Sequence, residues 1–175
     1  MPTPYIWMRK VLCITIYYDG EIGAFLEDVM GLERVRQWLL GYPGMEEVEG
    51  LTVDYYPAEP GVGSVAPAGL TEVARREDIL GNVAVEQTMS FQLSFVLVKD
   101  ERDDALATRN AQWLLDLQQW VQQQSLGKLA PTFGDLPRKE WVRAEDGALK
   151  EVSQEGTAVY AVRLTFGFMK MYEVS

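Results

Sequence analysis

Residues 83–98, with the sequence VAVEQTMSFQLSFVLV, alternate between apolar and polar side chains along almost their whole length. Because successive side chains of a strand point to opposite faces, this run predicts one long strand with an apolar face and a polar face. A second alternating run, residues 160–168 (YAVRLTFGF), predicts another strand of the same kind. The two runs predict a scaffold built on an antiparallel sheet, and neither contains a recognisable catalytic motif.

An amphipathic helix is predicted between these two strands. It begins at Asp103 or Asp104, where acidic side chains favour the N-terminal end of the helix dipole, and it ends at Gly127. An apolar stripe with three- and four-residue spacing is more typical of a helix that covers a sheet than of a ligand pocket. The stripe consists of Leu106, Trp113, Leu114, Leu117, Trp120 and Val121.

The segment before the long strand predicts a helix, a short strand and a hairpin. Residues 31–40 have helical spacing and end at the stop signals of residues 41–44, GYPG. Residues 51–56 alternate as a strand, and the prolines and glycines of residues 57–69 predict a loop. Residues 70–78 are typical of an exposed ribbon, which leads through a turn at Gly81 and Asn82 into the long strand.

The order helix, strands, helix, strands lacks the regular strand–helix alternation of a parallel sheet. After the central helix, residues 140–152 predict two strands joined by a turn at residues 145–147, EDG. The expected fold is therefore α+β, with a mostly antiparallel twisted sheet, helices packed on one face and a projecting β-hairpin. Residues 30–175 are expected to form a single domain of this kind.

Residues 1–29 are expected to be an N-terminal extension. Arg9 and Lys10 precede a short apolar stretch, which superficially resembles a signal peptide, but no small-residue cleavage site follows it. We interpret the segment as a strand followed by the start of a helix, or as the product of an upstream start. Met8 and Met30 are both alternative starts.

Composition excludes several kinds of site. The chain has 175 residues, of which 47% are hydrophobic, and no apolar run long enough to cross a membrane. It contains no histidine, which excludes a Ser-His or Cys-His nucleophile and a histidine-ligated zinc site. Its single cysteine, Cys13, excludes an intrachain disulfide and is expected to be a small buried hydrophobe. Carboxylate chemistry stays open, but no pair of acids is singled out.

The net charge of −10 is unevenly distributed: residues 19–59 hold ten acidic side chains and two basic ones. An acidic protein lacks the electrostatic footprint needed to bind phosphates, so nucleic-acid binding is disfavoured. The charge is interpreted either as a solubilising surface or as a surface that repels a passing polyanion. Residues 61–64, GVGS, lack the lysine and the following helix of a phosphate-binding loop.

One group of aromatic residues has two interpretations. Tyrosine and tryptophan line ligand pockets, and they also anchor protein interfaces, so the sequence leaves both roles open. The group consists of Tyr55, Tyr56, Trp141, Tyr160 and Tyr172.

Residues 31–173 resemble a family of tailed-phage proteins from phages and prophages of Gram-positive bacteria, which are similar to tail terminators and are often labelled minor capsid proteins. The resemblance is carried by four segments, which are the helix of residues 32–45 ending in YPGM, residues 51–61 (LTVDYYPAEPG), residues 91–121 and residues 156–168. Proteins of this family begin near the position of Met30.

The resemblance implies a virion structural protein that forms a homohexameric ring, caps the tail tube and meets the head connector. A neighbouring head completion protein of related fold is an alternative within the same resemblance. DNA would pass through the ring without specific binding, and the protein would reside in the host cytoplasm before it joins the virion. No catalysis, cofactor, metal or membrane contact is expected.

We expect the contacts between subunits on the ribbon and its flanks, because an exposed ribbon edge invites pairing with a neighbouring chain. The residues assigned to this interface are Tyr55, Tyr56, Leu70, Val73, Arg75, Arg76, Val85 and Gln87. The alternative function is a small-molecule or peptide-binding α+β domain that uses the aromatic group. A carboxylate-dependent enzyme is a third possibility.

Overall fold

The computed structural model describes residues 31–55, 59–100, 102–153 and 156–173. The expected extension of residues 1–29, Cys13 and Tyr56 lie outside the described residues. Within them, no helix is both long and apolar enough to cross a membrane. The chain runs through a helix over residues 31–39, η1 (Pro43–Glu47), β1 (Gly50–Val53), β2 (Val62–Glu77), β3 (Val83–Val98), α2 (Asp104–Leu126), η2 (Pro137–Lys139), β4 (Trp141–Val152) and β5 (Thr157–Tyr172).

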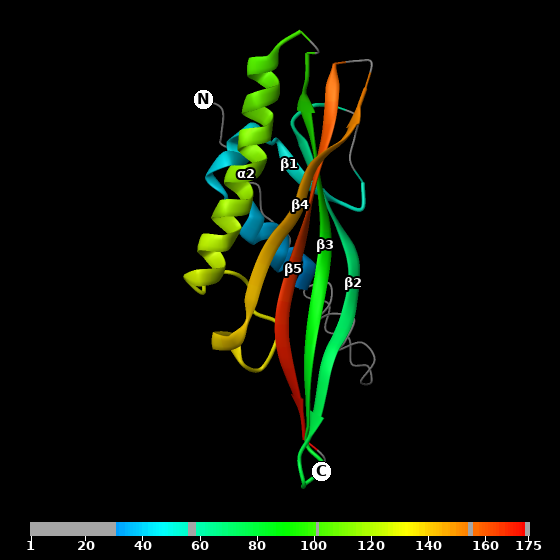
Figure 1. Cartoon of the computed structure of the whole chain (residues 1–175), viewed down its shortest axis with the longest axis vertical. Helices are drawn as coiled ribbons and strands as arrows, with labels where there is room; N and C mark the ends of the chain where they lie inside the picture. The colour runs from blue at the N-terminus through cyan, green and yellow to red at the C-terminus, as the bar shows by residue number, and fades with distance from the viewer. Residues whose placement is uncertain (1–30, 56–58, 101, 154–155, 174–175) are drawn as a thin grey trace, which may run out of the picture.

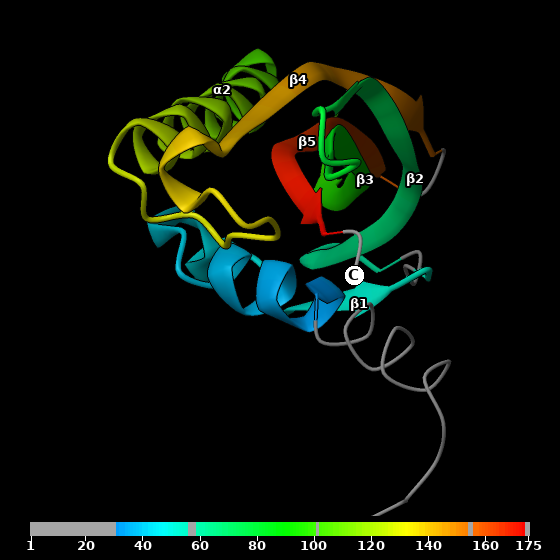
Figure 2. The ribbon, with the colours of Figure 1, turned by 90° about the horizontal axis from the view of Figure 1, so that it is seen from below.

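The fold is α+β, as the sequence predicted. Five strands form one sheet in the order β1-β2-β3-β5-β4, in which β1 and β2 are parallel and the other neighbours are antiparallel (Figure 1). The long strand predicted for residues 83–98 is confirmed, and it occupies the centre of the sheet as β3. Viewed along the long axis, the sheet is strongly twisted and β2 wraps around β3 (Figure 2).

The helix predicted after β3 is confirmed, together with its caps. The Asp103 carboxylate accepts a hydrogen bond from the backbone N–H of Leu106 at 3.0 Å, and Gly127 caps the other end. Except for Leu106, the residues of its apolar stripe pack with the sheet and with the helix of residues 31–39 in one hydrophobic core. The indole rings of Trp38 and Trp120 stack with their centroids 4.9 Å apart, which joins the two helices on the same face of the sheet.

The loop predicted for residues 57–69 is wrong over its second half, because β2 begins at Val62. Gly63 belongs to the strand because its bare backbone lies against the side chains of Leu51 and Phe95, where a Cβ would overlap them. A bulge lies between Pro67 and Gly69. Pro67 lies beyond the residues that pair with β1, so its lack of an N–H costs the sheet no hydrogen bond.

The two strands predicted for residues 140–152 are also wrong. These residues form the single strand β4, which pairs with β5 on both sides of residues 145–147. The turn-forming sequence produces a bulge instead of a reversal, with Asp146 at a φ of 58° and a register shift between Glu145 and Ala148.

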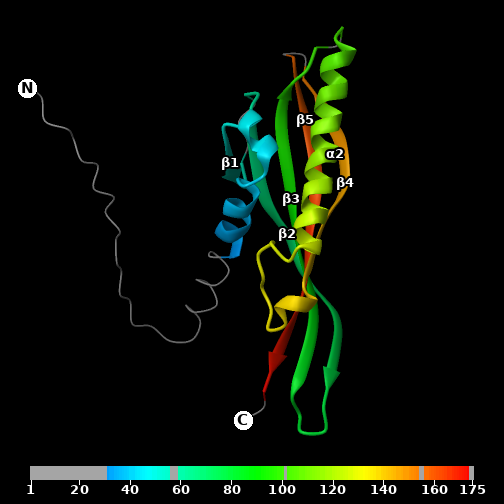
Figure 3. The same ribbon diagram turned by 90° about the vertical axis from the view of Figure 1, so that its left-hand side faces the viewer.

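The predicted hairpin of β2 and β3 is present, but it is not a free two-stranded arm. β5 pairs with β3 along its whole length, from Thr157 opposite Val98 to Tyr172 opposite Val83. The end of the hairpin therefore belongs to a three-stranded part of the sheet. Figure 3 shows the turn between β2 and β3 at one end of the molecule, with the C-terminal end of β5 beside it.

Candidate functional site: the distal ribbon

We use the name distal ribbon for residues 69–77 of β2, the turn of residues 78–82, residues 83–90 of β3 and residues 165–172 of β5. The pairing register defines this unit, because Ser90 lies between Gly69 and Thr165, and Val83 lies between Glu77 and Tyr172. The distal ribbon extends to the end of the molecule that lies away from the start of α2 (Figure 3).

The turn of the distal ribbon is held by one carboxylate. Oδ1 of Asp78 accepts hydrogen bonds from the backbone N–H groups of Leu80 at 2.8 Å and Asn82 at 3.0 Å, and Oδ2 accepts from the Asn82 amide at 2.9 Å. These donors, the Asn82 side chain first, lower the pKa of Asp78. Between them, Ile79 and Leu80 point outward, with Ile79 fully exposed and Leu80 76% exposed.

A bulge in β2 sets the charged pair of the distal ribbon. Arg75 donates two hydrogen bonds to the Glu72 carboxylate, from Nε at 3.1 Å and from a terminal nitrogen at 2.8 Å. This pair lowers the pKa of Glu72 and raises that of Arg75. Because both side chains are exposed, the pair fixes local geometry more than it stabilises the fold.

The distal ribbon carries several exposed apolar side chains, although the protein has a net charge of −10. The exposed apolar side chains come from both outer strands and from the turn, whereas Val85 on the central strand is buried. They are Leu70 (61% exposed), Val73 (57%), Ile79 (102%), Leu80 (76%), Met171 (49%) and Tyr172 (52%).

The two outer edges of the sheet differ. Gln118 of α2 donates to the Ala144 carbonyl at 2.9 Å, and the Ser125 hydroxyl accepts from the Val142 N–H at 3.0 Å, so side chains of α2 cover the first part of the β4 edge. Beyond the start of β4, Asp135 covers the β5 edge by bonding to the backbones of Met169 and Met171.

The edge of β2 has no such cover among the described residues. β1 pairs with β2 only from Val62 to Val65, so residues 66–77 have β3 on one side and no described strand on the other. This edge is interrupted by bulges, by Pro67 and by charged side chains. Such features prevent unlimited pairing of strands from other chains. The uncovered part of β2 therefore favours a contact made by its side chains at one position, and not backbone pairing with another strand.

Six of the eight residues assigned to the interface lie on the distal ribbon, and four of these, Leu70, Val73, Arg75 and Arg76, are exposed. Gln87 is half-buried on β3, and Tyr55 is 65% exposed in the loop after β1. Tyr56 lies outside the described residues.

Val85 is only 3% exposed, which leaves it little surface for a partner. Its cross-strand neighbours are Arg75 and Lys170, whose long aliphatic stems flank it on the same face. Sequence reasoning missed Ile79 and Leu80. The available signal was two adjacent apolar residues inside a polar turn that begins at Asp78 and ends at Gly81 and Asn82.

The four described members of the aromatic group do not line a common pocket. Tyr160 is buried in the core, Trp141 is half-buried, and Tyr55 and Tyr172 are exposed at separate places. Trp141 lies flat against Gly167, where a Cβ would overlap its ring, and the Arg143 guanidinium lies 4.5 Å from the centre of the indole.

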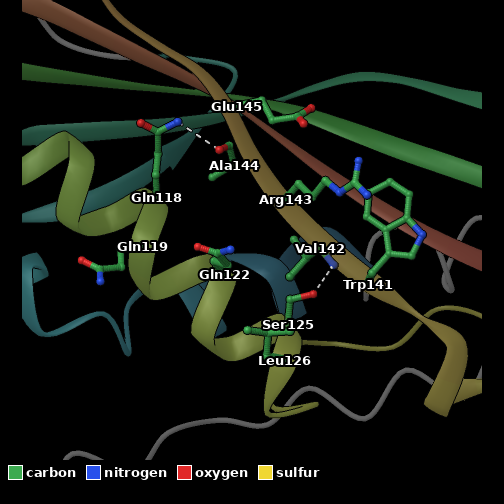
Figure 4. A pocket seen from close by; sticks show the side chains of 10 residues that line it. All are labelled: Gln118, Gln119, Gln122, Ser125, Leu126, Trp141, Val142, Arg143, Ala144 and Glu145. Carbon is green, nitrogen blue, oxygen red and sulfur yellow. Dashed lines mark hydrogen bonds between the residues drawn. The ribbon is translucent and has the colours of Figure 1, made fainter.

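A groove of about 590 Å³ runs between α2 and β4 beside this stack (Figure 4). Its lining mixes polar and apolar side chains: Gln118, Gln119, Gln122, Ser125 and Leu126 come from the helix, and residues 141–145 come from the strand. Its chemistry suits a polar ligand or a peptide. In the described part of the chain, no three acidic or cysteine side chains gather where they could hold a metal ion.

A scan against protein-family models found no match for this chain. A search of curated proteins also found no match. Function is therefore inferred from the residues and their geometry.

Proposed function

We propose that this chain is a structural subunit of a tailed-phage or prophage virion, similar to a tail terminator, which forms a ring that caps the tail tube and joins it to the head connector. The observation that carries the proposal is the distal ribbon, a long extension of the sheet with exposed apolar side chains beside an uncovered strand edge. The resemblance of residues 31–173 to this class of phage protein supplies the identity of the assembly.

The distal ribbon suits association between copies of the same chain. Leu70 and Val73 expose more than half of their surface, and burying apolar surface against a partner is favourable by about 25 cal/mol per Å². A contact between two different surfaces of identical subunits closes into a ring when the rotation between them allows it. Six copies would give the homohexamer that the resemblance implies.

The acidic charge suits passage of DNA. A net charge of −10 gives the subunit no general attraction to phosphate, so a ring of such subunits would let the nucleic acid slide without specific binding. A strongly positive inner surface in an assembled ring would contradict this part of the proposal. We propose no catalytic step and no bound cofactor, and the subunit would reside in the host cytoplasm until it joins the virion.

Solution mass tests the proposal. Light scattering on the full chain, alone and with assembled tail tube, should show a species near six copies in one of the two conditions. A variant with Leu70→Glu and Val73→Glu should stay monomeric in both, because it places charge on the apolar surface. Leu149→Glu is a matched control, because Leu149 is 42% exposed on β4, outside the distal ribbon. A wild-type chain that is monomeric in both conditions would overturn the proposal.

A second candidate function follows from the groove between α2 and β4, which could take a small polar molecule or a peptide. Arg143, held over Trp141, would supply a charged donor for such a ligand. If this alternative is correct, the protein is a monomer that binds its ligand saturably. Arg143→Ala should lower the affinity for the ligand, whereas Leu70→Glu and Val73→Glu should leave that affinity unchanged.

A further inference from the structure

We infer that Ile79 and Leu80, at the turn of the distal ribbon, insert into a hollow on a second copy of this chain formed by Trp38, Leu129 and Pro131. The inference rests on the proposed self-association and assigns its two contact surfaces. Self-association alone requires neither surface, so each assignment can fail independently of it.

The turn presents its apolar side chains at little entropic cost. The three hydrogen bonds to the Asp78 carboxylate fix the backbone around Ile79 and Leu80 before any partner arrives. A pre-organised anchor loses less conformational freedom on binding than a flexible loop does. Burial of these two aliphatic side chains against a partner removes their apolar surface from water, which favours association.

Ile79 is fully exposed, so the described part of its own chain does not bury its side chain, and a second copy can supply the apolar contact. The hollow lies between the helix of residues 31–39 and the segment after α2, and has a volume of about 360 Å³, which is room for two aliphatic side chains. Leu129 at its edge is 66% exposed, and Trp38 is half-buried within it. The larger groove beside α2 is lined by glutamines and suits aliphatic side chains less well.

Charges around the two surfaces are compatible. Arg76 and Glu77 flank the turn on the distal ribbon, and both are exposed. Glu33 and Arg34 line the hollow. Arg34 is held in place because it donates to the Thr132 carbonyl at 2.7 Å and lies over the Phe133 ring. Asp78 adds a second negative charge to the turn, whereas Glu33 at the hollow is paired with Arg36 at 3.3 Å and leaves the positive charge of Arg34 unbalanced. The two surfaces therefore carry opposite net charges at the rim of the contact.

The turn and the hollow are different surfaces of the same chain, so this contact is heterologous. Every subunit then offers one turn and one hollow, and a ring satisfies all of them. A contact through identical patches would stop at a dimer. The inferred pairing is therefore the kind that a closed ring requires.

Mixed disulfide formation tests the contact directly. In a Cys13→Ser background of the full chain, Ile79→Cys and Leu129→Cys are made as separate variants, mixed under conditions in which the wild type associates, and oxidised mildly. Disulfide-linked dimers are expected in the mixture and in neither variant alone. Leu149→Cys mixed with Ile79→Cys is the matched control and should give no linked dimer.

A second variant measures the contribution of the anchor. Ile79→Ser with Leu80→Ser keeps Asp78 and Asn82, so the turn should be retained, and circular dichroism should be unchanged. Its dissociation constant for self-association is expected to rise about 100-fold, from about tenfold for each aliphatic side chain lost.

The outcomes separate the two proposals. If the chain associates and the mixture of Ile79→Cys with Leu129→Cys gives no linked dimer, or no more than the Leu149→Cys control, the inferred contact is wrong and the ring proposal stands. Unchanged association of the double serine variant would overturn the anchor in the same way. If the wild type does not associate even with assembled tail tube, both proposals fail.

Discussion

Arg75 and Glu72 lie on the same face of β2 although they are three residues apart, because Val73 between them is an extra residue. Glu72 lies opposite Gln87 and Arg75 lies opposite Val85, two positions of β3 that share one face. In a regular strand, residues three apart point to opposite faces. The bulge thus creates the ion pair, and the pair in turn stabilises the bulge at the centre of the exposed β2 edge.

The pairing predicts the acid titration of Glu72. Its carboxyl group should titrate below the usual 4.5, because Arg75 donates to the ionised form. The stability supplied by the pair is present above the unfolded-state pKa and is lost as the pH falls through the lower folded-state pKa. Carboxyl-detected NMR titration should show the pKa returning toward its ordinary value in Arg75→Gln. Arg76→Gln is the control, and an identical shift in both variants would contradict the assignment.

Glu140 is predicted to hold the loop that covers the β5 edge. The carboxylate is 6% exposed and accepts hydrogen bonds from the backbone N–H groups of Phe133 at 2.7 Å and Gly134 at 2.8 Å. Glu140→Ala should lower the free energy of unfolding by about 2 kcal/mol, since it leaves two half-buried donors unpaired, and Glu140→Gln should cost less. Urea denaturation measures both, with the exposed Lys139→Ala as the control.

Local opening provides an independent check on that loop. Asp135 follows the two residues that Glu140 holds, and its carboxylate accepts from the Met171 N–H. Hydrogen exchange at Met171 should therefore accelerate in Glu140→Ala under fully folded conditions. Slow exchange at Met171 in that variant would show that Asp135 covers the strand edge without help from Glu140.

Tyr42 is predicted to make stability fall at high pH. Burial, followed by the nearby charges of Asp116 and Glu47, raises its pKa to about 12. Between the unfolded value near 10 and this folded value, the unfolded chain releases the phenol proton while the folded chain keeps it, so stability declines as the pH rises.

The measurement is the difference in unfolding free energy between the wild type and Tyr42→Phe. The advantage of the wild type should be constant below pH 10 and should shrink above it by about 1.4 kcal/mol for each pH unit. A difference that stays flat up to pH 12 would show that the phenol ionises equally in both states. All other ionisable groups are common to the two proteins, so their contributions cancel in this comparison.

Gly167→Ala is predicted to disturb the stack of Arg143 on Trp141. A Cβ at Gly167 would overlap the indole ring, which lies flat against the glycine. Displacement of the ring should cost about 1–3 kcal/mol, the usual range for overpacking. Thermal unfolding measures the destabilisation caused by Gly167→Ala, both in the wild type and in a Trp141→Ala background. The cost should be smaller in that background, because the ring that causes the overlap is gone.

The alternation of apolar and polar residues predicted the centre of the fold well, because a strand buried on one face must alternate in this way. The strand of residues 83–98 and the helix that begins after Asp103 were predicted to within a residue or so of their ends. The local pattern failed where a turn-forming sequence lies inside a paired strand. Pro67, Gly69 and residues 145–147 are accommodated as bulges because long-range pairing with β3 and β5 outweighs the local preference for a turn.

The candidate site was predicted only in part for a related reason. Leu70 and Val73 were assigned correctly to an exposed ribbon, whereas Val85 was assigned to the interface from its position alone and is buried between the stems of its neighbours. The asymmetry between the sheet edges depends on contacts such as Gln118 to Ala144, which join residues 26 positions apart. Patterns within one segment carry no information about such contacts.

The pairing of Val83 with Tyr172 also has a consequence for synthesis. These partners are 89 positions apart, so β3 leaves the ribosome long before the strand that flanks it on the second side. Contacts of such sequence separation form late in folding because a large loop must close first. A nascent chain therefore holds β2 and β3 as an incomplete pair, and this end of the sheet becomes three-stranded only after β5 has been made. Until then, the edge of β3 that β5 later covers lacks its partner strand, and an open edge of that kind is where another chain can pair by mistake.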